Sequence, residues 1–100
     1  AQAGIHPHVA DEATEADLEE IRRIVTTNPK VVAVGETGLD YDRMYSKKEN
    51  QLHFFKALIA MAEELGKPMF LHERDAADDF LACFKGHEGF AAIGRPLLYR

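Results

Sequence analysis

The sequence predicts an α/β fold in which parallel strands alternate with helices. Two short apolar runs, Val31–Val34 and Pro68–Leu71, have the length and composition of buried strands, and helical patterns lie before, between and after them. Strands that alternate with helices pair in parallel and are joined by right-handed crossovers. Each run also leads directly into polar residues, Gly35-Glu36 in the first case and His72-Glu73 in the second.

The first helical segment has clear signals at both ends. Thr14 is the predicted N-cap, with Asp17 three residues later, and Asn28-Pro29 ends the helix because proline disfavours the helical conformation in the residue before it. Between these signals, the apolar residues at helical spacing are Leu18, Ile21, Ile24 and Val25.

Two further helices follow the two strands. Ser46 and Glu49 have the spacing of a capping box, and Gly66 is predicted to follow directly after that helix, as its C′ residue. For the last helix we predict Asp75 as the N-cap and Gly86 as the stop.

Glu36 and His72 are the strongest candidates for chemistry. The carboxyl ends of parallel strands meet at one edge of a sheet, so the two side chains should lie close together. A carboxylate is a hard oxygen ligand for Mg²⁺, Mn²⁺ or Zn²⁺, and an imidazole can bind such an ion through one nitrogen. The sequence therefore predicts a metal site made by Glu36 and His72.

Arg74 and Asp40 have two interpretations each. The Arg74 guanidinium suits a pair of phosphate oxygens, or else it forms an ion pair with one of the aspartates within 75–79. Asp40 either orients a metal ligand or a metal-bound water, or else closes an Asx-type turn after Gly38. We take both as candidate catalytic residues beside Glu36.

Four segments together resemble the TatD family of metal-dependent deoxyribonucleases, which are amidohydrolase-like barrels. They are G-I-H-P-H at 4–8, V-G-E-T-G-L-D-Y at 34–41, Gln51 and Phe55 on the following helix, and P-M-F-L-H-E-R-D-A at 68–76. The resemblance implies a TIM-type (β/α)8 barrel, two divalent metal ions at the strand ends, and hydrolysis of DNA phosphodiesters. It also implies that Glu36 and His72 are metal ligands.

The resemblance covers a central slice of such a barrel. A complete barrel takes about 250 residues, so this chain supplies about four βα units, a single partial domain over residues 1–100. The family's Asp-x-His-x-His motif would lie upstream, no histidine occurs at 89–96, and residues 95–100 are atypical. In the family pattern the H-P-H at 6–8 is distinct from the ligand-bearing histidines, so we expect His6 and His8 to line the rim of the site.

Composition narrows the possible partners. The net charge of −5 argues against nucleic-acid binding through a broad basic surface, but bound cations can supply positive charge at a phosphate. No apolar run approaches the roughly 18 residues of a membrane span. The only cysteine, Cys83, is predicted to be a buried thiol, which suits a reducing compartment; we expect the cytoplasm, or also the nucleus in a eukaryote.

Two other functions remain open at this stage. The same rim can serve an amidohydrolase that cleaves amide or ester bonds, or the chain can be a truncated, non-catalytic product. A half-barrel also leaves two open sheet edges. We therefore expect the isolated chain to need the missing barrel segments or self-association for stability.

Overall fold

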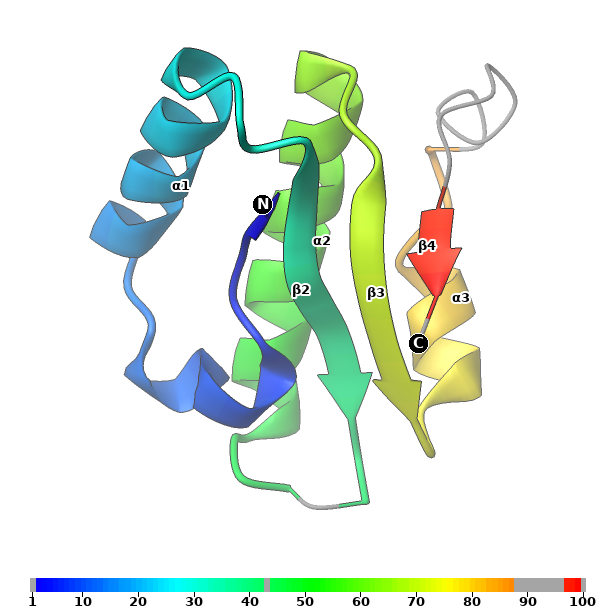
Figure 1. Ribbon diagram of the computed structural model, residues 1–100. Helices are drawn as coiled ribbons and strands as arrows, with labels where there is room; N and C mark the ends of the chain where they lie inside the picture. Colours follow the sequence, from blue (N-terminus) through cyan, green and yellow to red (C-terminus); the bar gives the residue numbers. More distant parts are fainter. Residues whose placement is uncertain (1, 43, 88–96, 100) are drawn as a thin grey trace.

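The computed structural model describes residues 2–42, 44–87 and 97–99, and these form a four-stranded sheet backed by helices (Figure 1). All three strand pairs are parallel, in the order β1-β2-β3-β4. The strands are β1 (Gln2–Ala3), β2 (Ala33–Asp40), β3 (Met69–Arg74) and β4 (Leu97–Tyr99). The predicted α/β class with parallel pairing is confirmed.

Three α-helices and one 3₁₀-helix connect the strands. Their bounds are η1 (Pro7–Glu12), α1 (Glu15–Thr27), α2 (Lys48–Leu65) and α3 (Ala77–Ala82). In Figure 1, α2 and α3 lie behind the sheet and α1 lies beside α2. Helix α2 packs against β2 and α1, whereas α3 packs against β3. The carboxyl ends of β2 and β3 thus lie at one edge, beside η1.

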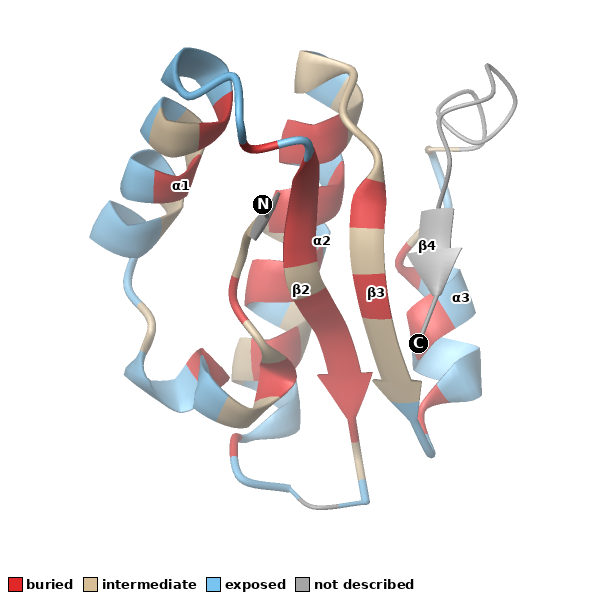
Figure 2. Ribbon diagram, in the orientation of Figure 1, coloured by how far each residue is buried: buried red, intermediate tan, exposed pale blue. Residues whose placement is uncertain are grey.

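The core lies between the sheet and α2, as the burial colours of Figure 2 show for β2 and the facing helix. Phe55, Leu58 and Ile59 of α2 are completely buried, together with Leu39 of β2 and Met69 of β3. The apolar spacing along α2 turns these three side chains to one face, and the alternation of the strands supplies the opposite surface. This packing fixes β2 and β3 relative to the start of α2.

The predicted start of α1 and the predicted end of α2 are confirmed. The Thr14 hydroxyl accepts a bond from the Asp17 amide at 3.2 Å, and the Asp17 carboxylate accepts one from the Thr14 amide at 2.9 Å. Gly66 follows α2 with a φ of 67°, a left-handed conformation that glycine adopts without strain.

Two predicted caps are wrong. Ser46 does not cap α2, which begins after Lys47; instead its buried hydroxyl accepts a bond from the Asp11 amide at 2.9 Å and donates one to the His8 carbonyl at 3.1 Å. Asp75 does not cap α3 either. It has a φ of 56°, and the Glu73 carboxylate accepts the Ala76 amide at 2.8 Å in its place. Ser46 is therefore engaged in tertiary contacts, and a neighbouring carboxylate takes the place of Asp75.

The last helix is shorter than predicted. Helix α3 ends at Ala82, with Cys83 as its C-cap, so Gly86 lies beyond the helix and not at its end. Residues 88–96, where the family pattern would place the next strand and its histidine, lie outside the described residues. Strand β4 falls in the atypical segment 95–100 and pairs with β3. None of the described helices is long and apolar enough to cross a membrane.

Strand β2 is longer than predicted, and Glu36 lies inside it. We expected the strand to end at Gly35, but it continues to Asp40. Gly35 pairs with Phe70 and Thr37 pairs with the next residue, Leu71, so Glu36 is left over at a bulge. Bulges of this kind change the direction of a side chain and are frequent next to active sites. The glutamate is thereby presented from within the strand.

Candidate metal centre

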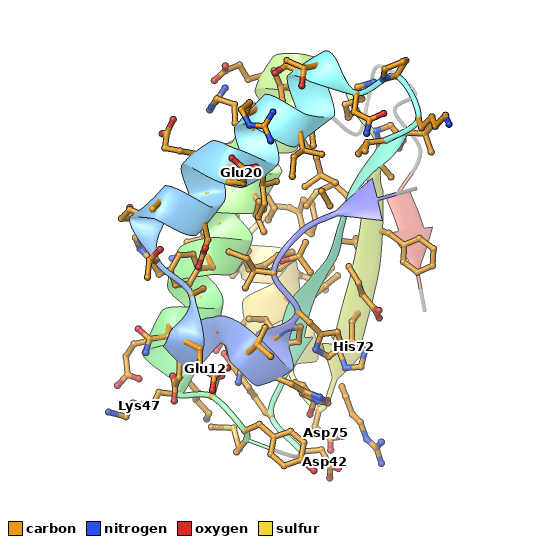
Figure 3. The ribbon with its side chains drawn as sticks, turned by 60° about the vertical axis from the view of Figure 1, so that its left-hand side comes forward. Glu12, Glu20, Asp42, Lys47, His72 and Asp75 are labelled. Carbon is orange, nitrogen blue, oxygen red and sulfur yellow. The ribbon has the colours of Figure 1, made fainter. Side chains whose placement is uncertain are left out.

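Glu36 and His72 converge as predicted, from neighbouring parallel strands. His72 lies within β3 opposite Gly38 of β2, and its Nδ1 is 3.6 Å from Oε2 of Glu36. Figure 3 shows His72 toward the carboxyl end of β3, near the loop that carries Asp42 and the turn that carries Asp75. Both side chains are partly buried, so solvent can still reach the space between them.

Two further histidines complete the cluster. After β1 the chain turns into η1, which places Nε2 of His6 3.9 Å from Oε2 of Glu36 and the His6 ring centroid 4.8 Å from that of His72. His8 lies next to His6, with ring centroids 4.4 Å apart, and also approaches Asp40. The sequence pattern placed His6 and His8 at the rim of the site and not among the metal ligands. The signals that were available are the His-x-His spacing at 6–8 and the position shortly after β1.

Asp40 joins the two halves of the cluster. Its side chain is buried, and Oδ2 lies 2.9 Å from Nε2 of His8 and 2.9 Å from Nε2 of His72. Its other oxygen, Oδ1, accepts the Asp42 amide at 3.0 Å, which is an Asx-type turn. The two interpretations of Asp40 are therefore compatible, because one oxygen closes the turn and the other orients histidines.

These contacts decide which nitrogen of His72 is available. An ionised carboxylate only accepts hydrogen bonds, so the His72 nitrogen facing Asp40 carries the proton. In the neutral ring the other nitrogen, Nδ1, then has its lone pair toward Glu36. A carboxylate that fixes the tautomer of a histidine in this way is a common support for a metal ligand.

His6 has the opposite arrangement. Its Nδ1 accepts the backbone amide of His8 at 3.1 Å, so the neutral ring carries its proton on Nε2, the nitrogen that faces Glu36. Burial lowers the pKa of His6, with repulsion from His8 and His72 adding to the effect and the carboxylates of Glu36 and Asp40 opposing it. His6 is therefore a neutral hydrogen-bond donor at the edge of the site.

Two overlapping groups have the composition of a metal site. They are His6, Glu36 and His72, and His8, Asp40 and His72, and the ligand atoms within each group lie within 4.8 Å of one another. In the second group, two hydrogen bonds already join Asp40 to both imidazoles. In the first, Glu36 and Nδ1 of His72 face each other beyond hydrogen-bond distance. One hard oxygen and one imidazole nitrogen suit Mn²⁺ or Zn²⁺, so these residues fit a divalent ion.

Arg74 lies at the edge of the cluster and is exposed. Its Nε is 3.4 Å from a carboxylate oxygen of Asp42, so the ion pair predicted with an aspartate within 75–79 is instead made with a residue after β2. The cause is the strand register, which pairs Arg74 with Asp40 and so brings it beside the loop that follows β2. Asp79 has a different partner, because the Tyr41 hydroxyl donates to it at 2.7 Å.

The remaining titratable candidates lie away from this centre. Cys83 is buried, as predicted, and burial raises the pKa of its thiol, so a nucleophilic role is disfavoured. His53 is exposed and pairs with Glu15 at 2.9 Å. His87 lies 2.9 Å from Glu63.

A parallel sheet with imidazoles and carboxylates gathered near the carboxyl ends of its strands is the arrangement expected of one segment of a (β/α)8 barrel. Comparison with known proteins shows to which family of barrel proteins the chain is similar. The family model described as TatD related DNase matches residues 1–94. The chain belongs to this family, as the sequence motifs predicted.

Individual relatives agree with the family assignment. A protein of Erwinia billingiae named 3'-5' ssDNA/RNA exonuclease TatD is 46% identical over 80 residues, which cover 80% of this chain and 30% of the relative. A protein of the same name from Edwardsiella piscicida is 44% identical and covers the whole chain and 34% of its own length. The chain thus spans about a third of the length of these relatives.

Solved structures show the same fold. The crystal structure of a hydrolase TatD family protein from Entamoeba histolytica superposes with a TM-score of 0.72 at 35% identity, over 85% of this chain and 30% of that one. The chain is therefore a partial barrel of the TatD type.

Proposed function

We propose that this chain supplies part of the metal centre of a nuclease that hydrolyses DNA phosphodiester bonds, with Glu36 and His72 as ligands. The observation that carries the proposal is the pair formed by Oε2 of Glu36 and Nδ1 of His72, 3.6 Å apart, with Asp40 holding the other nitrogen of the ring. This is one ligand of each kind, with the imidazole oriented before any ion binds. Family membership and the names of the relatives support the nucleic-acid substrate.

The side chains around this pair have separate tasks. A bound divalent ion would act as a Lewis acid toward the phosphate and lower the pKa of a bound water. Asp40 fixes the ring of His72, and His6 directs its Nε2–H into the same space, where it can donate to a phosphate oxygen. Arg74 is exposed, and Asp42 at 3.4 Å is its one ion-pair partner among the residues that the structure describes, so its guanidinium can exchange that partner for a substrate phosphate.

The number and identity of the metal ions and the type of bond cleaved belong to the same proposal. Two ions in the complete protein, of Mg²⁺, Mn²⁺ or Zn²⁺, need ligands from other barrel strands as well. Hydrolysis of an amide or ester would use the same groups, and so it is the alternative that the experiment must separate. A cytoplasmic location stays a prediction.

The test is cleavage of a labelled single-stranded oligonucleotide by the full-length protein, compared with its Glu36→Gln variant. Glutamine keeps the size of the side chain but removes the charge that holds the cation, so we expect cleavage to fall by about 100-fold or more while the circular dichroism spectrum is unchanged. The Arg74→Lys variant should lose less, mainly through a higher KM, because a point charge replaces a two-pronged donor. Near-normal cleavage by folded Glu36→Gln would contradict the proposed mechanism. A full-length protein that cleaves amides or esters but no oligonucleotide would favour the amidohydrolase alternative.

A further inference from the structure

We propose that Gln51 is a positioning residue for the metal centre, through a clamp on the backbone of Asp40. This inference rests on the proposed function and deepens it. Gln51 lies in the first turns of α2, is 2% exposed and touches neither Glu36 nor His72 in any hydrogen bond of the described residues. Its effect on the site would be exerted through Asp40.

The side-chain amide of Gln51 bonds both backbone groups of Asp40. Oε1 accepts the Asp40 amide at 2.8 Å, and Nε2 donates to the Asp40 carbonyl at 3.2 Å and to the Ser46 carbonyl at 2.8 Å. These bonds satisfy the backbone N–H and C=O groups of Asp40, the residue at which β2 ends. A buried backbone group without a partner is costly, so the clamp holds this strand end in one conformation.

Only an amide has the chemistry that this position requires. The Asp40 N–H needs an acceptor, and the two carbonyls need a donor, so the orientation of the Gln51 amide follows from its partners. A glutamate would set a carboxylate oxygen against two carbonyl oxygens. A methionine would fill the space but leave all three backbone groups without their partner.

The clamp is connected to both sides of the metal centre. Gln51 holds the backbone of Asp40, and so it also fixes the position of the Asp40 carboxylate. That carboxylate lies 2.9 Å from Nε2 of both His8 and His72. Ser46, the other residue that Gln51 bonds, donates its hydroxyl to the His8 carbonyl at 3.1 Å. Displacement of the Asp40 backbone would therefore release the ring of His72, whose Nδ1 faces Glu36.

The experiment compares the full-length protein with its Gln51→Glu and Gln51→Met variants, with and without Zn²⁺. In the metal-free protein, NMR should detect slowly exchanging ring Nε2–H protons of His8 and His72, and both variants should lose them. Zinc affinity, measured by calorimetry, should fall by about 10–100-fold, as when the support of a metal ligand is removed. The matched control is Asn28→Ala, which removes an exposed side-chain amide at the end of α1 that bonds only the Lys30 amide among the described residues, and it should retain both properties.

Each outcome has a distinct meaning. Folded Gln51 variants that keep the two ring protons, and bind Zn²⁺ as the parent protein does, would overturn the clamp. A full-length parent protein that does not bind Zn²⁺ would contradict the proposed function, while the ring protons would still report on the clamp.

If neither variant folds, the clamp can still be tested by a measurement on the unmodified protein. The side-chain amide protons of Gln51 should exchange at least about tenfold more slowly than those of exposed Asn28, because buried, hydrogen-bonded amides are protected. Equal exchange rates would refute the clamp.

Discussion

Among the buried side chains that the structure describes, Thr37 is the one whose polar group has no hydrogen-bond partner. It lies between Glu36 and Gly38 in β2, is 1% exposed, and its hydroxyl has no hydrogen-bond partner among the described residues. A buried hydroxyl without a partner loses its bonds to water and costs about 1–3 kcal/mol.

Thr37→Val replaces that hydroxyl by a methyl group of the same shape. We expect the free energy of unfolding to stay equal or to rise by about 1 kcal/mol, because the desolvation cost disappears while the branched side chain keeps its packing. Urea denaturation followed by circular dichroism measures the change. A loss of stability greater than about 1 kcal/mol would mean that the hydroxyl is bonded in solution, for example to a buried water.

Residue types and spacing were sufficient to predict Glu36 and His72 as neighbours, because both follow apolar strand residues in a parallel sheet. For His6 and His8 they predicted a place at the rim of the site, but not membership of the candidate ligand groups. These two residues join the cluster because η1 is tied to the start of α2: the Asp11 carboxylate accepts the Lys47 amide at 2.9 Å, and Ser46 bonds the His8 carbonyl. Contacts between segments over thirty positions apart leave no local pattern in a sequence.

At the scale of elements, the contact between β2 and β3 depends on Gly38. Its φ is 148°, and a Cβ at this position would collide with the backbone carbonyl oxygen of His72. The strand pair can thus approach this closely only with glycine here. The backbone of His72, a proposed ligand, is the neighbour that a larger residue would displace.

Gly38→Ala should therefore destabilise the chain by about 2–3 kcal/mol and weaken metal binding, since it combines a strained φ with a backbone collision. Gly86→Ala is the matched control. Gly86 also has a positive φ, 87°, but a Cβ there meets no atom within 4 Å, so about 1 kcal/mol is expected. Urea denaturation of the two variants side by side measures the difference. Equal losses would show that the approach of β2 to β3 is less tight than described.

The elements themselves were predicted well where local signals decide them, as at the capping box of Thr14. The ends of the elements were predicted less well where tertiary contacts determine them. Strand β2 continues past the expected end at Gly35 because Leu39 is completely buried in the core and the pairing with β3 resumes after the bulge at Glu36. A glycine-rich segment of this kind resembles a loop when only its composition is considered.

At the scale of the whole molecule, the described sheet has open edges at β1 and β4, which consist of two and three residues. In a complete barrel each edge strand would pair with a neighbour, which closes the sheet. The relatives are about three times as long as this chain, which is the size difference between a partial and a complete barrel.

We therefore expect the isolated chain to associate with rising concentration and to show no nuclease activity. With His6 serving as a donor, two protein ligands remain, whereas catalytic zinc sites usually have three. Sedimentation velocity over a concentration series tests the association, and cleavage of a labelled oligonucleotide with and without EDTA tests the activity. Robust, EDTA-sensitive cleavage by the monomeric chain would show that the ligands are misassigned.

The central claim is that Glu36 and His72 bind a divalent cation, and paramagnetic broadening by Mn²⁺ tests it most directly. At low Mn²⁺ concentrations, NMR signals should broaden first at Glu36 and His72 and at neighbouring His6, and these effects should vanish in the Glu36→Gln variant. Broadening centred on the aspartates within 75–79, or equal broadening in the parent chain and in Glu36→Gln, would contradict the account.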